Sequence, residues 1–228
     1  MGATLTDIEL CVFDAYGTLF DFNSAVARHR SAIGPKADAL SEMWRTKQIQ
    51  YTWLRNSMGV YAPFWQVTGE ALDNCLATFG IADKTVREKL MGAYLALDPF
   101  PEVPAMIEKL EKAGKRLAIL SNGNPEMLDP MVKASGLADR FEAVISIDAA
   151  KVFKVDPRTY ALVEQRLGVK PGKVCFLSSN CWDAHGAAHF GFNVVWVNRS
   201  GMPEDNLPGK IATQLEDLSH LPPLLGVA

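Results

Sequence analysis

The chain has 228 residues, of which 48% are hydrophobic and 21% are charged, with a net charge of −3. This composition is typical of one large or two modest globular units with an ample core. No extended basic patch accompanies the charge, so we expect no nucleic acid partner. No apolar run approaches the length that spans a bilayer, so we expect no membrane partner.

The cysteine pattern and the N-terminus indicate a reducing compartment. The four cysteines form no C-x-x-C pair, and two of them, Cys11 and Cys175, lie inside apolar, strand-like runs. No N-terminal stretch resembles a signal peptide. We therefore expect free thiols and a cytoplasmic location.

The first predicted strand covers residues 10–13, a short apolar run. It ends at Asp14, and Gly17 and Thr18 then allow a sharp turn. Ligands of open α/β sheets bind at the carboxyl ends of the strands. Asp14 is thus placed for chemistry, although a lone D-x-x-G segment is equally compatible with an aspartate that caps a loop.

A long block without strand signals follows, from about residue 24 to residue 97. Apolar side chains recur near the 3.6-residue period and predict helices over residues 37–58, 64–79 and 84–97. We interpret residues 21–97 as an all-helical cap that is inserted into another unit.

From residue 99 onward, helices and strands alternate. The predicted helices cover residues 103–113, 125–135, 156–167 and 182–190, and the predicted strands cover residues 116–120, 141–147, 173–177 and 193–197. Alternation at this spacing predicts an α/β fold, a Rossmann-like parallel sheet flanked by helices, built from residues 1–20 and 98–228. The strand at 193–197 is the last clear one, and the Pro- and Gly-rich tail from Leu221 is expected to fray.

Polar clusters follow four of the predicted strands. They consist of Asp14, the pair Ser121 and Asn122, then Lys154, and last the group Ser178, Asn180 and Asp183. Lys154 alone would read as a solvated lysine, and Asp183, in a first helical turn, would also stabilise the helix dipole. Four such clusters in one parallel sheet together predict a single site.

These clusters carry a family resemblance. The segments Phe-Asp-Ala-Tyr-Gly-Thr at 13–18, Leu-Ser-Asn-Gly at 120–123, Lys-Val-Asp-Pro at 154–157 and Ser-Ser-Asn-Cys-Trp-Asp at 178–183 resemble the four motifs of the haloacid dehalogenase superfamily. Within it, the chain is most similar to the L-2-haloacid dehalogenase (type II) group, because residues 43–48 and 51–55 also resemble that group's first cap helix.

Two positions distinguish this group from the phosphatases of the superfamily. The phosphatases are expected to carry a second aspartate as general acid where this chain has Tyr16, and acidic Mg²⁺ ligands where it has the run 178–180. Phosphoryl transfer needs a cation, whereas halide displacement does not. We therefore expect no metal and no other cofactor.

The resemblance implies a two-step mechanism with a covalent ester on Asp14. The catalytic residues that it implies are Asp14, Lys154, Asp183, Arg45, Ser178 and Asn180. Lys154 would orient Asp14, Arg45 would stabilise the departing halide together with Asn122, and Asp183 would activate a water held by Asn180 and Ser178.

The resemblance also implies how the substrate, a short 2-haloacid, is held. The implied binding residues are Ala15, Tyr16, Ser121, Asn122, Ile49, Phe64, Tyr160 and Trp182. Ser121 and the backbone amides after Asp14 would hold the substrate carboxylate, and the aromatic and aliphatic members would keep the pocket dry. A homodimer is expected on the same basis.

Several of these residues have plainer interpretations. Arg45 is compatible with a solvated helix face, and Tyr160 and Trp182 with packing alone. His185 and His189 have a spacing that two zinc ligands could share, but no third ligand is evident, which favours packing or surface positions. Val155 stands where relatives usually have proline, and its β-branched side chain is expected to keep Lys154 in place.

Two other functions remain open at this point. A Mg²⁺-dependent phosphatase would need the missing second aspartate. A catalytically idle relative could bind a partner through its aromatic, Met-containing cap, but that interpretation leaves Asp14, Arg45, Lys154 and Asp183 without a purpose.

Overall fold

A computed structural model describes residues 5–227 of the chain. Its centre is a six-stranded sheet in the order β5-β4-β1-β6-β7-β8, in which every neighbouring pair is parallel. The strands are β1 (Leu10–Phe13), β4 (Arg116–Ser121), β5 (Ala143–Ser146), β6 (Val174–Ser178), β7 (Asn193–Val197) and β8 (Thr213–Leu215). The predicted Rossmann-like α/β architecture is confirmed.

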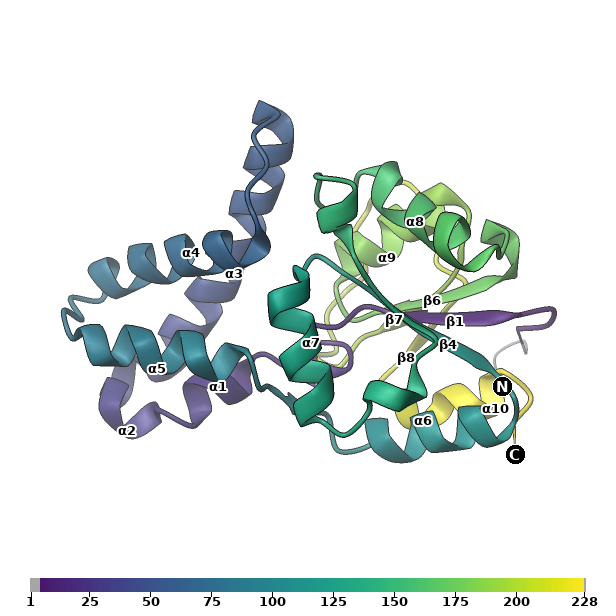
Figure 1. Cartoon of the computed structure of the whole chain (residues 1–228), viewed down its shortest axis with the longest axis horizontal. Coiled ribbons are helices and arrows are strands. Elements are labelled where there is room, and N and C mark those ends of the chain that lie inside the picture. The colour runs from purple at the N-terminus through teal and green to yellow at the C-terminus, as the bar shows by residue number, and fades with distance from the viewer. Residues whose placement is uncertain (1–4, 228) are drawn as a thin grey trace.

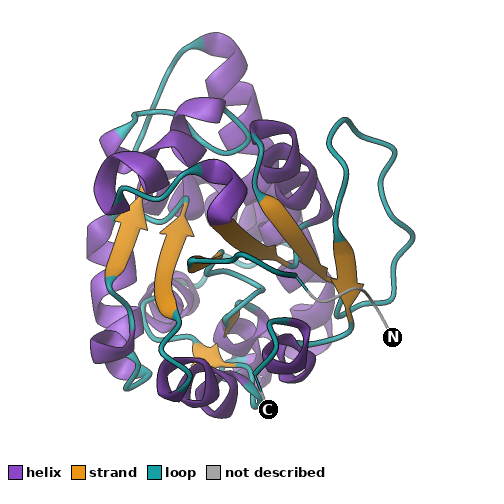
Figure 2. Cartoon of the chain, turned by 90° about the vertical axis from the view of Figure 1, so that its right-hand side faces the viewer, coloured by secondary structure: helices purple, strands orange, loops and turns teal. Residues whose placement is uncertain are grey.

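Helices cover both faces of this sheet, with the strands in the interior (Figures 1 and 2). Helices α8 (Pro157–Leu167) and α9 (Cys181–Phe190) lie over one face, and α6 (Val103–Lys112), α7 (Pro125–Ala134) and α10 (Leu221–Leu224) lie on the other side. All four residues of β1 are fully buried, as expected of a central parallel strand. Burial of each large apolar side chain contributes about 1.5–3 kcal/mol to stability.

A separate group of helices lies beside the sheet (Figure 1). These helices are α1 (Asn23–Ala27), α2 (Arg30–Ile33), α3 (Ala37–Met58), α4 (Phe64–Thr78) and α5 (Lys84–Tyr94). Where the chain leaves and rejoins the core, β2 (Phe20–Asp21) pairs antiparallel with β3 (Asp98–Pro99). We refer to residues 21–97 as the cap. Residues 1–4 and 228, which the prediction assigns to the core, lie outside the described residues.

Several details differ from the sequence prediction, among them α5, which ends at Tyr94 and not at residue 97. Strand β8 and helices α1 and α2 were not predicted, because three to five residues are too few to show a period. The strand predicted at 141–147 is shorter, since only Ala143–Ser146 pair with β4. The tail does not fray over its described length: Leu221 and Leu225 are buried, and α10 packs on α6.

The four cysteines are free, as predicted, and Cys11, Cys75 and Cys175 are buried. Among the described residues, no helix combines the length and the apolar character that crossing a bilayer requires.

Candidate active site

The site is built around Asp14, at the carboxyl end of the central strand. Its backbone N–H donates to Leu177 O on the neighbouring strand at 2.8 Å, which extends the β1–β6 ladder to Asp14 itself. Gly17, at φ +86°, then turns the chain away, in a conformation that side-chain-bearing residues rarely adopt. On either side of Asp14, β4 ends at Ser121 and β6 ends at Ser178. The sheet therefore brings the predicted strand-end clusters to one edge.

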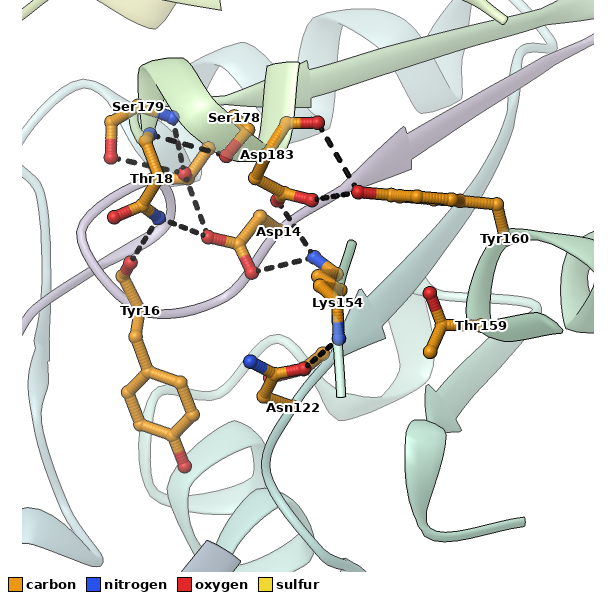
Figure 3. Close-up of polar contacts among 12 residues, drawn as sticks. Asp14, Tyr16, Thr18, Asn122, Lys154, Thr159, Tyr160, Ser178, Ser179 and Asp183 are labelled. Atoms are coloured by element: carbon orange, nitrogen blue, oxygen red, sulfur yellow. Dashed lines mark hydrogen bonds and ion pairs between the residues drawn. The ribbon is translucent and has the colours of Figure 1, made fainter. Parts of the chain in front are cut away.

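A buried lysine joins two carboxylates at this edge (Figure 3). Lys154 Nζ donates to Asp14 Oδ1 at 3.0 Å and to Asp183 Oδ2 at 2.9 Å. The side chains of Lys154 and Asp183 are 1% and 0% exposed, and that of Asp14 is 8% exposed. Buried charges persist in a protein only when they are paired, and here one ammonium serves both carboxylates.

The surroundings of Lys154 and Asp183 shift the pKa of each of these two groups upward. Burial acts to lower the pKa of Lys154, but the adjacent charges of Asp14 and Asp183 outweigh burial and raise that pKa above its usual value, so the ammonium stays charged. Burial raises the pKa of Asp183, although Lys154 and a hydrogen bond from Tyr160 act against the shift. A raised pKa makes the Asp183 carboxylate a stronger base than an ordinary aspartate, which suits proton transfer.

Tyr160 is the second partner of Asp183. Its hydroxyl donates to Asp183 Oδ1 at 2.7 Å, and burial raises the pKa of the tyrosine well above its usual value. Gly186 makes this approach possible, because a Cβ at that position would lie 2.7 Å from the Tyr160 oxygen. Both oxygens of Asp183 are thus fixed in position.

The second oxygen of Asp14 is held by a different loop. Asn180 Nδ2 donates to Asp14 Oδ2 at 2.9 Å, and Thr18 Oγ1 lies 3.4 Å from the same atom. Ser178 Oγ in turn accepts from the Asn180 backbone N–H at 3.2 Å, which fixes the start of α9. Donors on both oxygens of Asp14 set the orientation of its carboxylate.

The cap contributes Arg45, which extends from α3 toward the same loop. Its Nη2 donates to Asn180 Oδ1 at 3.2 Å and lies 3.4 Å from the carbonyl oxygen of Tyr16. Its guanidinium also lies over the ring of Phe22, 5.0 Å from the centroid. A positive charge from the cap therefore approaches Asp14 through the Asn180 side chain.

Ser121 and Asn122 lie on the other side of Asp14 and hold backbone groups. Ser121 Oγ accepts from the Gly123 N–H at 3.1 Å. Asn122 Oδ1 accepts from the Lys154 N–H at 3.0 Å, so this amide fixes the segment from which the lysine extends. Asn122 thus holds the backbone of Lys154 directly before Val155.

The cap also holds this lysine segment directly. Asn56, near the end of α3, donates to Phe153 O at 2.8 Å and accepts from the Phe153 N–H at 2.9 Å. A single cap helix therefore carries both Arg45 and the side chain that anchors the residue before Lys154.

Apolar residues close the space between the cap and the core. Tyr16 is buried, with ring centroids 5.8 Å from Phe64 and 5.4 Å from Tyr94. Ala15 and Ile49 are also buried. Figure 3 shows the Tyr16 ring directed away from the Asp14 carboxylate.

Trp182 has a different environment. Its ring packs edge-to-face on Trp53, at a centroid distance of 5.4 Å. It lines hollows in the surface together with Val155 and Leu207. His185 is buried with Nδ1 2.9 Å from Gly209 O, and His189 is exposed, positions that fit packing and surface roles.

Sequence reasoning did not assign Thr18, Gln48, Thr68 or Tyr94 to the site. Thr18 was interpreted only as a turn residue, yet its hydroxyl faces Asp14 and accepts from the Ser179 N–H at 2.8 Å. The three cap residues have no motif of their own. The available signal was that Gln48 and Thr68 are polar residues on the apolar faces of their helices.

The donors of this site suit an anionic ligand rather than a cation. Among residues 5–227, no group of three or more His, Cys, Asp and Glu side chains is arranged to hold a metal ion. Lys154 contacts Asp14 directly, and Arg45 is connected to Asp14 through the Asn180 side chain. The parallel sheet, the strand-end aspartate and the helical cap together define a Rossmann-like hydrolase with an inserted cap.

Comparison with known proteins identifies the family. The model of the haloacid dehalogenase-like hydrolases matches residues 8–191. The chain is 47% identical to (S)-2-haloacid dehalogenase 4A of Burkholderia cepacia over 219 residues, which cover 96% of this chain and 95% of that protein. The chain therefore belongs to the haloacid dehalogenase-like hydrolase family and, within it, to the L-2-haloacid dehalogenase group.

Solved structures agree with this assignment. A crystal structure of a dehalogenase superposes with a TM-score of 0.95 at 46% identity, covering 98% of this chain and all of that one. The L-2-haloacid dehalogenase from Xanthobacter autotrophicus with chloropropionic acid covalently bound superposes with a TM-score of 0.89 at 40% identity, covering 96% of this chain and 98% of the other. This chain is thus a hydrolase that shares the fold of these enzymes and belongs to the L-2-haloacid dehalogenase group.

Proposed function

We propose that the protein hydrolyses short-chain L-2-haloalkanoic acids to D-2-hydroxy acids and halide, through an ester on Asp14 and without a metal ion. The observation that carries the proposal is the arrangement around Asp14. Lys154 and Asn180 orient its carboxylate, and Arg45 approaches from the cap on the side of Asn180. The similarity to a dehalogenase with covalently bound chloropropionic acid supports the covalent step.

In the first step, a carboxylate oxygen of Asp14 attacks C2 of the haloacid opposite the carbon–halogen bond. The new C–O bond forms as the carbon–halogen bond breaks, and the halide leaves with the bonding pair, which inverts the centre. Ser121 and the backbone amides of Ala15 and Tyr16 hold the substrate carboxylate, and Arg45 and Asn122 stabilise the departing halide.

In the second step, water hydrolyses the ester. Asp183 accepts a proton from a water held by Asn180 and Ser178, and the water oxygen attacks the carbonyl carbon of Asp14. The ester C–O bond then breaks and the alkoxide takes up the proton that Asp183 had accepted. The second proton of the water is released to solvent, which restores the Asp14 carboxylate. The raised pKa of Asp183 supports its role as the base.

Independence from metal is proposed on the charges of this site. The Lys154 ammonium lies between the two carboxylates, where it neutralises charge that a cation would otherwise have to neutralise. Tyr16 offers no carboxyl group that could act as the general acid of a phosphatase. These two features favour halide displacement over phosphoryl transfer.

We further propose a cytoplasmic homodimer. Large apolar side chains are exposed around the C-terminal half of α3 and beside it, at Trp53, Leu54, Met58, Val60, Val155 and Leu207. A second copy of the chain that covers this face would remove them from water. Sedimentation of the wild type and of Met58→Glu tests this: a dimer that the substitution weakens is expected, and a monomeric wild type would contradict it.

The deciding experiment measures halide release from separate L- and D-2-chloropropionate in buffer containing EDTA. Release from the L form alone is expected. No halide release, together with hydrolysis of phosphate esters when Mg²⁺ is added, would favour the phosphatase. Halide release that requires added Mg²⁺ would contradict the proposed independence from metal. No turnover of any haloacid or phosphate ester, with a partner captured by the cap, would favour the idle relative.

A further inference from the structure

A chain of buried hydrogen bonds in the cap ends on Arg45. Thr68 Oγ1 donates to the carbonyl oxygen of Phe64 at 2.7 Å, and Gln48 Nε2 donates to Thr68 Oγ1 at 2.7 Å. Gln48 Oε1 then accepts from Arg45 Nη1 at 2.8 Å. This series of hydrogen bonds thus connects the backbone of α4 to the guanidinium of Arg45 on α3.

The direction of this chain is determined at its far end. A backbone carbonyl can only accept, so the single hydroxyl proton of Thr68 is committed to Phe64. Thr68 must therefore accept from Gln48, which turns the amide nitrogen toward Thr68 and the amide oxygen toward Arg45. Tyr94 donates to the same oxygen at 3.1 Å and reinforces this orientation.

The Gln48 amide and its partners are shielded from water. Gln48 is 1% exposed, and Thr68 and Tyr94 are buried as well. The burial of Tyr94 also raises its pKa, which keeps its hydroxyl protonated and able to donate. A buried chain of hydrogen bonds is rigid, because each lost bond would leave a buried polar group unpaired.

We infer that Gln48 is a positioning residue for Arg45, an inference that rests on the proposed dehalogenation. Gln48 binds Nη1 and leaves Nη2 directed at the site, where it donates to Asn180. A long side chain with several free torsions is thereby preorganised for the halide before the substrate arrives. The neutral amide holds the guanidinium without cancelling the charge that the halide needs.

The test uses two substitutions of Gln48 that disturb its bond to Arg45 in different ways. Gln48→Met keeps the side-chain length but removes the acceptor, and Gln48→Glu keeps the acceptor but adds a charge that pairs with Arg45. Both are expected to slow single-turnover halide release from L-2-chloropropionate about 10- to 100-fold, the range of one hydrogen bond to a charged group. Hydrolysis of the preformed ester should keep its rate.

Two readouts separate positioning from general damage. Bromide leaves more readily than chloride, so the loss of rate should be smaller with L-2-bromopropionate. In an Arg45→Ala background, Gln48→Met should cost less than about twofold, because a residue that acts only through Arg45 has nothing left to position. Thr52→Val is the matched control, since Thr52 is buried one turn further along α3 and its hydroxyl donates to Ile49 O of the same helix.

The outcomes are distinct. Unchanged chloride release by Gln48→Met and Gln48→Glu, or an equal further loss in the Arg45→Ala background, would overturn the inference while the proposed function stands. Lack of halide release by the wild type would overturn both. Should either variant fail to fold, Tyr94→Phe and Thr68→Val weaken the same chain from its other members, and the same dependence on the halogen is expected.

Discussion

Arg45 on the cap donates to the side-chain oxygen of Asn180 on the core, with 3.2 Å between Nη2 and Oδ1. The amide nitrogen of the same asparagine donates to Asp14. The Asn180 amide therefore connects Arg45, the proposed halide-binding residue, to Asp14, the proposed nucleophile. Because the cap supplies one partner and the core the other, the site is complete only when the two are docked.

Arg45→Lys should lower kcat for L-2-chloropropionate by about 10- to 100-fold. Lysine keeps the charge, but one ammonium cannot reproduce the fork that reaches Gln48 with one nitrogen and Asn180 with the other. Steady-state halide release checks this. Wild-type kinetics in the variant would argue against a specific halide contact.

Asp14→Ala should reduce turnover by at least about a thousandfold, because the ester cannot form without the carboxylate. Circular dichroism should show an intact fold. Asp83→Asn is a suitable control, since Asp83 only caps the exposed start of α5. Residual activity above a few per cent would remove Asp14 as the nucleophile.

Asp183→Asn should allow the ester to form but not to break, because the amide cannot accept the water proton. Mass spectrometry after incubation with L-2-chloropropionate should find the propionate-derived group on the peptide that contains Asp14. The double variant Asp14→Ala/Asp183→Asn should carry no such group. If the single variant accumulates none, Asp183 is not the hydrolytic base.

Lys154→Met should destabilise the fold by about 3–5 kcal/mol at neutral pH, because two buried carboxylates lose their shared cation. The pKa of Asp183, already raised by burial, should rise further, so the folded state takes up a proton more readily than the unfolded chain. Such a group contributes stability that is present at low pH and is lost as pH rises through its folded pKa.

The destabilisation by Lys154→Met should therefore shrink as pH falls toward the ordinary pKa of aspartate, about 3.9. Denaturant unfolding at several pH values measures it. Lys151→Met removes an exposed ion pair with Asp148 and should change stability by less than about 1 kcal/mol. A deficit of Lys154→Met that is independent of pH would contradict the electrostatic explanation.

The rule that ligands bind at the carboxyl ends of parallel strands predicted which residues meet at the centre of this site. Asp14, Lys154 and Asp183 are far apart in the sequence, yet each follows a predicted strand, and parallel strands bring their ends to one edge. The role of Arg45 came from the resemblance of its helix, since a cationic residue on an amphipathic helix has no signal of its own.

The supporting contacts could not be predicted in the same way. The bond between Gln48 and Thr68 joins two helices whose relative rotation depends on side-chain packing, which periodicity does not specify. Thr18 was predicted only as a turn residue, because the sequence does not indicate that its hydroxyl faces Asp14. Short elements such as β8 could not be predicted, because three residues contain no measurable period.

Tyr160→Phe should move the acid side of the pH–kcat profile to higher pH. The Tyr160 hydroxyl donates to Asp183 Oδ1 at 2.7 Å, and this bond acts against the rise in the pKa of Asp183 that burial causes. Removing the hydroxyl lets that pKa rise further. Because Asp183 must be ionised to accept the water proton, a higher pH is then needed for half-maximal activity.

The ring of Tyr160 packs against Phe176, Phe190 and Phe192, so phenylalanine should preserve the local core. Tyr61→Phe is the matched control, because Tyr61 also donates to a carboxylate, that of Asp148, at 2.6 Å. It should leave the acid side of the profile in place. If Tyr160→Phe leaves that side unmoved, Tyr160 does not act through the ionisation of Asp183.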